Sequence, residues 1–205
     1  KSLNKIFVSC GFKKGDKKME LEKGAYPKVL VRPVVVVTTI SKRGIANAAP
    51  FSLNSPMNFE PPLYGFSCNS EHDTWKNIRA NGEFVVNVAG KELGALMHVL
   101  ETDYPYEDNE IAHAGLTEEK AKAVKPPRIK EAIAWIECKL EKYTESDGHI
   151  WITGSVLAVG VKDEFWKEPG VMDVEKAKPL CHVAGEFFAE DMKGAKYKRA
   201  KSYTL

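Results

Sequence analysis

The feature that most constrains the fold is the apolar run PVVVVTTI at residues 33–40. Val and Ile are β-branched residues, which favour extended strands. In this run the apolar side chains are continuous, whereas a half-buried strand alternates apolar and polar positions. The run therefore predicts a strand that is buried on both of its faces.

Further strand-like segments follow, and most of them are separated by turns instead of by helices. The hairpin signal Asp147-Gly148 joins two long segments. The regular strand–helix alternation of a doubly wound nucleotide fold is absent from the sequence. We therefore expect a mainly β, antiparallel barrel or sandwich with a few flanking helices. The expected strands cover residues 33–40, 47–53, 61–69, 83–90, 132–143, 150–161 and, as one short last strand, 179–190.

Three helices are also expected. Residues 73–82 form one, with Asp73 or Thr74 as its N-cap and Asn81-Gly82 as its stop. Residues 91–100 place apolar side chains at helical spacing, and residues 117–124 are expected to form a short third helix. Within residues 132–143, alternation predicts that Glu137 points outward with Lys139 and Glu141, and that their apolar neighbours point inward. Residues 54–62 are interpreted as a short connection.

Composition describes an ordinary soluble globule: 43% of the residues are hydrophobic and 28% are charged. Residues 1–24 are lysine-rich and interpreted as a peripheral extension, and residues 25–205 as a single domain. Thirty basic residues against 28 acidic ones leave no basic footprint for nucleic acid. No apolar run reaches the roughly 20 residues that cross a bilayer. With four scattered cysteines and no secretory signal, a cytoplasmic location is expected.

Common catalytic and binding motifs are missing. The histidines and cysteines show no CxxC or HExxH spacing, and Cys181 and His182 would point to opposite faces of a strand. No metal site is therefore expected. The sequence also lacks the GxSxG motif of hydrolases, the Walker A loop and the GxGxxG fingerprint.

One segment, SCNSEHDTWKNI at residues 67–78, combines a strand end, a polar turn and a helix start. Free N–H groups and the helix dipole make such a start suitable for a phosphate. Hydroxyl and amide side chains in the turn can add hydrogen bonds, and Lys76 or Arg79 can add charge. The alternative is an ordinary capped surface helix.

The preceding stretch, residues 47–53, is apolar and interrupted by Pro50. Ala48 and Ala49 are small enough for a flat ring to approach the backbone, and Ser52 can reach a polyol or phosphate. Because the two strands are joined by a short connection, their ends are expected to lie near the helix start. A ring on the strand and a phosphate on the helix together describe FMN.

At these residues the sequence resembles the flavin-reductase-like FMN-binding split barrels, including the flavoredoxin group. The resemblance covers about residues 26–188 and rests mainly on residues 32–68 and 72–88. It implies a Greek-key split barrel, a homodimer, and FMN near the subunit interface. It places His182 on a terminal strand close to the flavin. The implied cofactor-binding residues are Asn47, Ala48, Ala49, Pro50, Phe51, Ser52, Leu53, Ser67, Cys68, Asn69, Ser70, His72, Asp73, Thr74 and His182.

Two departures from the family pattern stand out. Many relatives carry a basic residue in the phosphate turn, whereas this turn reads NSEHD and contains only His72. The charged segment 101–127 has no clear counterpart.

Two functions remain open. The first is an NAD(P)H-dependent flavin oxidoreductase in which bound FMN carries the chemistry and passes electrons to an unknown acceptor. The second is a flavoredoxin-like FMN carrier that a protein partner reduces. A third reading, a flavin-binding or purely structural barrel without turnover, also has no sequence motif against it.

Overall fold

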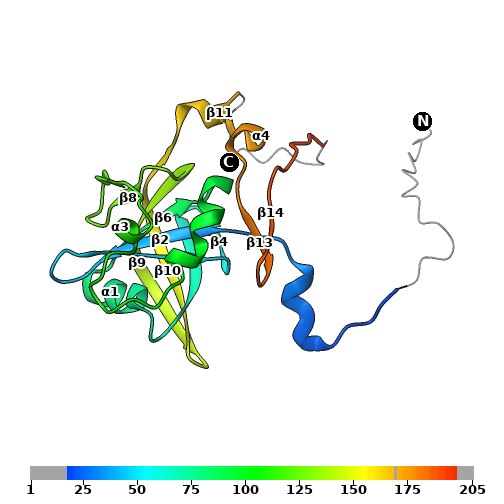
Figure 1. Cartoon of the computed structure of the whole chain (residues 1–205). Helices are drawn as coiled ribbons and strands as arrows, with labels where there is room; N and C mark the ends of the chain where they lie inside the picture. Colours follow the sequence, from blue (N-terminus) through cyan, green and yellow to red (C-terminus); the bar gives the residue numbers. More distant parts are fainter. Residues whose placement is uncertain (1–17, 169, 198–205) are drawn as a thin grey trace.

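The computed structural model describes residues 18–168 and 170–197, arranged as a β-barrel with short helices around it (Figure 1). No helix in these residues is long and apolar enough to cross a membrane. The helices are η1 (Lys23–Val29), α1 (Asp73–Asn81), η2 (Lys91–Leu96), α2 (Met97–Leu100), α3 (Glu110–His113), η3 (Asp163–Phe165) and α4 (Val174–Ala177). The main strands are β2 (Val35–Ile40), β3 (Ala46–Phe51), β4 (Asn54–Phe59), β5 (Pro62–Asn69), β6 (Glu83–Val88), β9 (Ala134–Ser146) and β10 (His149–Val161). Shorter strands are β1 (Arg32–Pro33), β7 (Glu118–Glu119), β8 (Arg128–Ile129), β11 (Trp166–Lys167), β12 (Val171–Met172), β13 (Cys181–Ala184) and β14 (Phe187–Ala189).

The seven main strands form one antiparallel sheet in the order β3-β2-β6-β9-β10-β5-β4. Its two outer strands, β3 and β4, are consecutive in the chain and separated by only two residues. The backbone N–H of Ser67 donates to the carbonyl oxygen of Leu53 at that junction, at 2.9 Å. The chain therefore passes directly from one edge strand to the other, which curls the sheet into a barrel although β3 and β4 do not pair with each other. The crossing connection from β5 through α1 to β6 is of the Greek-key type, because β6 pairs with β2 and not with β5. The predicted mainly β, antiparallel barrel is confirmed.

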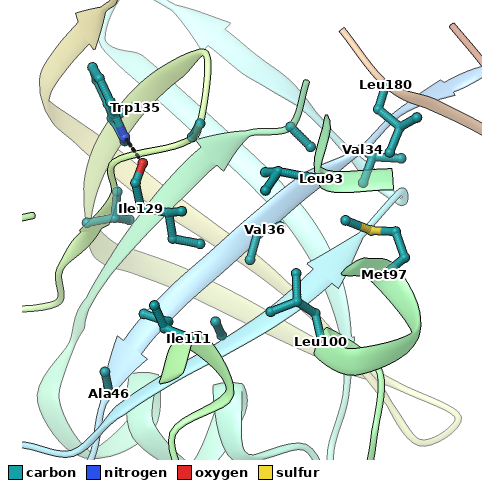
Figure 2. Close-up of a cluster of buried hydrophobic side chains, with 14 of the residues drawn as sticks. Val34, Val36, Ala46, Leu93, Met97, Leu100, Ile111, Ile129, Trp135 and Leu180 are labelled. Carbon is teal, nitrogen blue, oxygen red and sulfur yellow. Dashed lines mark hydrogen bonds between the residues drawn. The ribbon is translucent and has the colours of Figure 1, made fainter. Parts of the chain in front are cut away.

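The predicted double burial of the first strand is also confirmed, since residues 34–39 are all buried. Their side chains alternate between two cores. Val35 and Val37 point into the barrel, where they meet Phe66 and Phe84. Val34 and Val36 point outward beneath η2, α2 and α3, as Figure 2 shows.

Inside the barrel, the backbone of β10 approaches an aromatic ring closely at a glycine. A Cβ at Gly154 on β10 would lie 2.5 Å from the ring of Phe84. The aromatic ring occupies the space that any larger residue at this position would need. The Asp147-Gly148 hairpin turn was also predicted correctly, and both residues have positive φ.

The orientation predicted for Glu137 was wrong. Its side chain is fully buried, and its carboxylate accepts hydrogen bonds from the backbone N–H groups of Lys122 and Ala123 and pairs with Arg128. Alternation failed here because a long loop covers this part of the strand.

Three predicted element assignments were also wrong. Residues 54–59 form strand β4 instead of a connection, residues 117–124 contain strand β7 instead of a helix, and residues 181–189 form a hairpin instead of one strand. Proline is tolerated in β4 because it is exposed at the edge of the described sheet.

Helix α1 begins and ends close to its predicted limits. It stops at Gly82, which has a left-handed φ of 71°. The predicted N-cap was wrong: His72 occupies this position, and its side chain makes no capping hydrogen bond. Trp75 and Ile78 anchor the helix in the barrel core.

A small sheet of β1, β13 and β14 lies beside the barrel, with η1 next to it (Figure 1). Residues 18–24 are exposed, while the rest of the expected extension, residues 1–17, lies outside the described part. This small sheet carries His182 to the end of β3.

Candidate functional site

A cavity of about 640 Å³ lies between β3, the start of α1 and the segment that follows α2. This volume is within the range of small-molecule sites, about 300–1,000 Å³. The residues that line it are Asn47, Ala49, Pro50, Asn69, Glu71, His72, Asp73, Thr74, Lys76, Leu100, Glu101, Thr102, Asp103, Tyr104, Tyr106 and Glu110.

The wall from β3 provides a small apolar surface, Ala49 and Pro50, beside the buried amide of Asn47. On the outward edge of β3, part of the backbone hydrogen-bonding capacity is already used within the protein. The N–H of Ala48 donates to Glu110, at 3.0 Å, and Pro50 has no N–H. Hydrogen-bonding capacity left at these two positions therefore comes from carbonyl oxygens, which are acceptors.

The start of α1 forms the second wall. The N–H groups of Trp75 and Lys76 donate to the carbonyl oxygen of His72. The N–H groups of Asp73 and Thr74 have no acceptor among the described residues, as is usual for the first turn of a helix. Two free backbone donors thus lie beside the cavity.

The charge of this end of the cavity is mainly negative. Lys76 forms an ion pair with Asp73, with 2.9 Å between Nζ and Oδ1, and this hydrogen bond raises the pKa of Lys76. Burial lowers the pKa of His72, although the nearby carboxylate of Asp103 opposes the shift. Neutral His72 adds no positive charge, so backbone N–H groups are the main attraction for an anion.

A buried hydrogen-bond network joins three sides of the cavity. The amide of Asn47 donates to Glu110, at 2.9 Å, and its Oδ1 accepts from the hydroxyls of Thr39 and Thr74. Asn77 then donates to Thr39. The hydroxyl of Tyr106 donates to Asn77, at 3.0 Å. Strand β3, helix α1 and the segment before α3 are therefore held in one arrangement.

Glu110 is the most buried carboxylate of the cavity, with 6% of its surface exposed. Burial raises its pKa above the ordinary value of 4.5, against the opposing hydrogen bonds from Ala48 and Asn47. The nearby carboxylate of Asp73 raises it further. The structure therefore favours the protonated form of Glu110 more than water does.

A second, smaller hollow of about 80 Å³ lies on the other side of Pro50. Its lining includes Phe51, Ser52, His182 and Phe188. Pro50 and Glu101 line both hollows. The two spaces are therefore neighbours along β3.

His182 is held on both ring nitrogens. Nε2 lies 3.1 Å from the carbonyl oxygen of Gly185, which can only accept, so Nε2 carries the proton. Nδ1 then accepts from Arg32 and from the hydroxyl of Ser52, at 2.9 and 3.2 Å. His182 is thus fixed in position and tautomer at the edge of the smaller hollow.

The structure divides the residues expected from the sequence into three groups. Asn47, Ala49, Pro50, Asn69, His72, Asp73 and Thr74 line the main cavity. Pro50, Phe51, Ser52 and His182 line the smaller hollow. Neither lining includes Ala48, Leu53, Ser67, Cys68 or Ser70.

The residues outside the cavity have other contacts. The hydroxyl of Ser67 lies 3.3 Å from Nδ1 of His149, and Leu53 is 45% exposed. Ala48 is fully buried in the outer core. Burial raises the pKa of the Cys68 thiol to about 12, so this thiol stays protonated at neutral pH.

The wall formed by residues 100–106 and the buried position of Glu110 were not predicted from the sequence. Tyr104 and Tyr106 are aromatic residues in a charged segment, and this pattern is the one local signal that this wall offered. The contact of Glu110 with β3 joins residues about 60 positions apart in the chain, so no local spacing indicates it. No group of three or more potential metal ligands is found among the described residues.

Comparison with known proteins identifies the family. Residues 28–189 match the family model described as "Flavin reductase like domain". The chain belongs to the flavin reductase-like family. An uncharacterized protein of Aquifex aeolicus is 40% identical over 168 residues, which cover 79% of this chain and 85% of that protein.

Two solved structures share the fold. Nitrilotriacetate monooxygenase component B from Bacillus cereus has a TM-score of 0.77 and 26% identity, over 93% of this chain and all of that one. Flavoredoxin of Desulfovibrio vulgaris has a TM-score of 0.78 and 19% identity, over 89% of this chain and 97% of that one. The second likeness shows the split-barrel fold alone.

The family supports a flavin cofactor, and the lining of the cavity contains the two kinds of surface that a flavin needs. The apolar surface of Ala49 and Pro50 suits a flat ring, and the free N–H groups of Asp73 and Thr74 suit an anionic tail. The carboxylates around the cavity fit a phosphate less well.

Proposed function

We propose that this chain binds FMN in the main cavity, with the ring against Ala49 and Pro50 and the phosphate toward the start of α1. The observation that carries the proposal is the cavity itself, whose lining includes Ala49 and Pro50 of β3 and Asp73 and Thr74 at the start of α1. The cavity ends at a single helix start, which favours FMN over the larger FAD. Membership of the flavin reductase-like family supports the choice of a flavin.

The proposed activity is that of an NAD(P)H-dependent flavin oxidoreductase. Bound flavin would supply the electron-transfer chemistry, and the protein would hold it and leave one face open. The main cavity and the smaller hollow meet at Pro50, so a donor can approach from the side of His182. Membership of the flavin reductase-like family favours this reading.

A flavoredoxin-like electron carrier, reduced by a protein partner, is the second candidate. The fold shared with flavoredoxin of Desulfovibrio vulgaris favours it. Both candidates need bound flavin, and they differ in whether a nicotinamide nucleotide reduces it.

A homodimer is proposed as well. Several apolar side chains on one chain are exposed, among them Phe59 at 69%, Val159 at 69% and Phe187 at 76%. A second copy can cover such surface. Sedimentation of the FMN-bound protein at micromolar concentration tests this proposal, because a single species of 22.8 kDa would contradict it. The cytoplasmic location stays a prediction.

The test begins with the absorbance spectrum of the purified protein and with quenching of added FMN fluorescence. NADH or NADPH is then added without oxygen, and dithionite serves as the control reductant. Bleaching of the flavin absorbance by a nicotinamide nucleotide supports the oxidoreductase. Bleaching by dithionite alone supports the carrier, and failure to bind FMN contradicts both.

A further inference from the structure

Glu110 has an unusual environment for a carboxylate. It is buried in the wall of the main cavity, and none of the ion pairs among the described residues includes it. Its Oε1 accepts from Asn47 and its Oε2 accepts from the N–H of Ala48. Two neutral donors stabilise the carboxylate, but no cation balances its charge. Burying an unpaired charge is costly, so an additional proton is readily accepted.

The charged groups around Glu110 strengthen this tendency. On its own helix, His113 lies 3.0 Å from Asp108 and is therefore engaged away from Glu110. Lys76 on α1 is paired with Asp73. Strand β3 contributes no titratable side chain between its ends. The other titratable residues of the cavity lining are Glu71, His72, Glu101, Asp103, Tyr104 and Tyr106.

These surroundings are negative on balance, and burial raises the pKa of Glu110 above its ordinary value. The other carboxylates of the cavity are either exposed or paired. Glu71, Glu101 and Asp103 are exposed, so solvent screens their charge, and the half-buried Asp73 is paired with Lys76. Glu110 is therefore the carboxylate that responds most strongly to a new negative charge inside the cavity.

We propose that Glu110 is the proton-accepting residue of the cavity, and that its carboxylate takes up one proton when a bound flavin is reduced by two electrons. This inference rests on the proposed flavin site. Hydride transfer would break a C–H bond of the reduced nicotinamide and form a new bond from that hydrogen to the flavin, which would thereby gain two electrons and one proton. The nicotinamide becomes positively charged and departs, so one net negative charge stays in the cavity. A proton from water then forms an O–H bond on Glu110, which neutralises that charge.

The test is the midpoint potential of the bound flavin as a function of pH, in the wild type and in Glu110→Gln. One extra proton per two electrons changes the equilibrium constant tenfold for each pH unit, which is about 30 mV. We therefore expect a pH range in which the wild-type slope exceeds the slope of Glu110→Gln by about 30 mV per pH unit. Glu118→Gln is the matched control, because Glu118 is exposed and accepts from Asn109 at the start of the same helix. Its slope should equal that of the wild type.

Equal slopes in the wild type and Glu110→Gln, with flavin bound to both, would overturn the proposal and leave the flavin site standing. If the wild type does not bind flavin, the proposed function itself is contradicted. If Glu110→Gln does not fold, the infrared difference spectrum of the reduced and oxidised wild type decides. A carboxylic-acid C=O band must appear on reduction and change frequency in Glu110→Asp. Absence of the band in the wild type overturns the proposal.

Discussion

The two long walls of the cavity are built differently. One wall, made of β3, α1 and the Glu110 side chain that is hydrogen-bonded to β3, is buried: Asn47 is 7% exposed, Thr74 1% and Glu110 6%. The opposite wall, residues 101–103, is exposed and carries two carboxylates. Tyr106 connects the two walls through its hydrogen bond to Asn77. The difference suggests a division of roles, in which the buried wall holds a ligand in place and the exposed wall affects which ligands enter.

The same difference predicts unequal energetic effects. A buried donor or acceptor that loses its partner costs about 1–3 kcal/mol, whereas an exposed charge contributes little to stability. Substitutions on the buried wall should therefore change stability and binding together. Substitutions on the exposed wall should change only how charged ligands bind.

The largest effect is expected for Glu110→Ala, which leaves the Ala48 N–H and the Asn47 amide without their acceptor. The free energy of unfolding should fall by about 2–4 kcal/mol, measured by urea denaturation. The control on the exposed wall is Glu101→Ala, which should change it by less than about 0.5 kcal/mol. Similar effects of the two substitutions would show that the walls do not differ as described.

The pH dependence of this effect follows from the raised pKa of Glu110. Between its ordinary value of 4.5 and the raised value, the folded chain binds more protons than the unfolded chain. The stability due to Glu110 is thus fully present below pH 4.5 and is lost as the pH rises through the folded pKa. The cost of Glu110→Ala should therefore be larger at pH 5.5 than at pH 8. The opposite trend would mean that the hydrogen bonds lower the pKa of Glu110 more than burial raises it.

A smaller effect is expected for His182→Ala at the second hollow. Reduction of bound flavin by NADH should slow about tenfold, equivalent to about 1.4 kcal/mol. The dissociation constant of FMN should change less, because His182 lines the smaller hollow and not the main cavity. Anaerobic stopped-flow absorbance measures the rate, and Ser52→Ala serves as a control for the lost hydrogen bond. An unchanged rate would leave His182 with a structural role only.

Next in size is Asp73→Asn, which removes a negative charge near the proposed phosphate position and releases Lys76 from its ion pair. FMN should bind about fivefold more tightly, an effect on the order of 1 kcal/mol, because a repulsive carboxylate becomes neutral. Riboflavin lacks the phosphate and should show no change. Asp163→Asn, outside both hollows, is the control. Equal changes in the affinities for FMN and riboflavin would mean that the phosphate does not bind near Asp73.

The smallest effect is expected on the exposed wall. Asp103→Asn should increase the rate with NADPH relative to NADH about two- to threefold, because NADPH carries an additional phosphate that this carboxylate repels. Added salt should reduce the difference, since exposed charges are screened. Steady-state rates at low and high ionic strength measure it. If the ratio of the NADPH rate to the NADH rate changes neither with the substitution nor with salt, the charge of this wall does not affect which nucleotide reacts.

The buried wall could be predicted from the sequence because local patterns specify it. The apolar run of β2, the start and stop of α1 and the small residues of β3 are all short-range signals. The hydroxyls assigned to the phosphate illustrate the limit of such patterns. Thr74 donates to Asn47, and Ser67 lies beside His149. Backbone N–H groups are therefore left as the phosphate donors.

The exposed wall and Glu110 could not be predicted, for a physical reason. Charged segments are usually solvated, and only tertiary contacts place residues 101–110 against β3. The burial of Glu137 has the same origin, because its partners lie in the loop that covers it. Strand β4 was missed because its proline, Pro56, is compatible with an exposed edge, which a local pattern cannot distinguish from a connection.

The central claim, that a flavin binds between the two walls, is tested most directly by blocking the cavity. Ala49→Trp places a large ring on the β3 wall, while Glu164→Trp adds the same side chain on η3, outside both hollows. FMN binding is measured by fluorescence quenching, and folding by urea denaturation. The account predicts that Ala49→Trp folds and loses FMN affinity at least about 100-fold, or about 2.7 kcal/mol, and that Glu164→Trp binds like the wild type. A folded Ala49→Trp that binds FMN with unchanged affinity would contradict it.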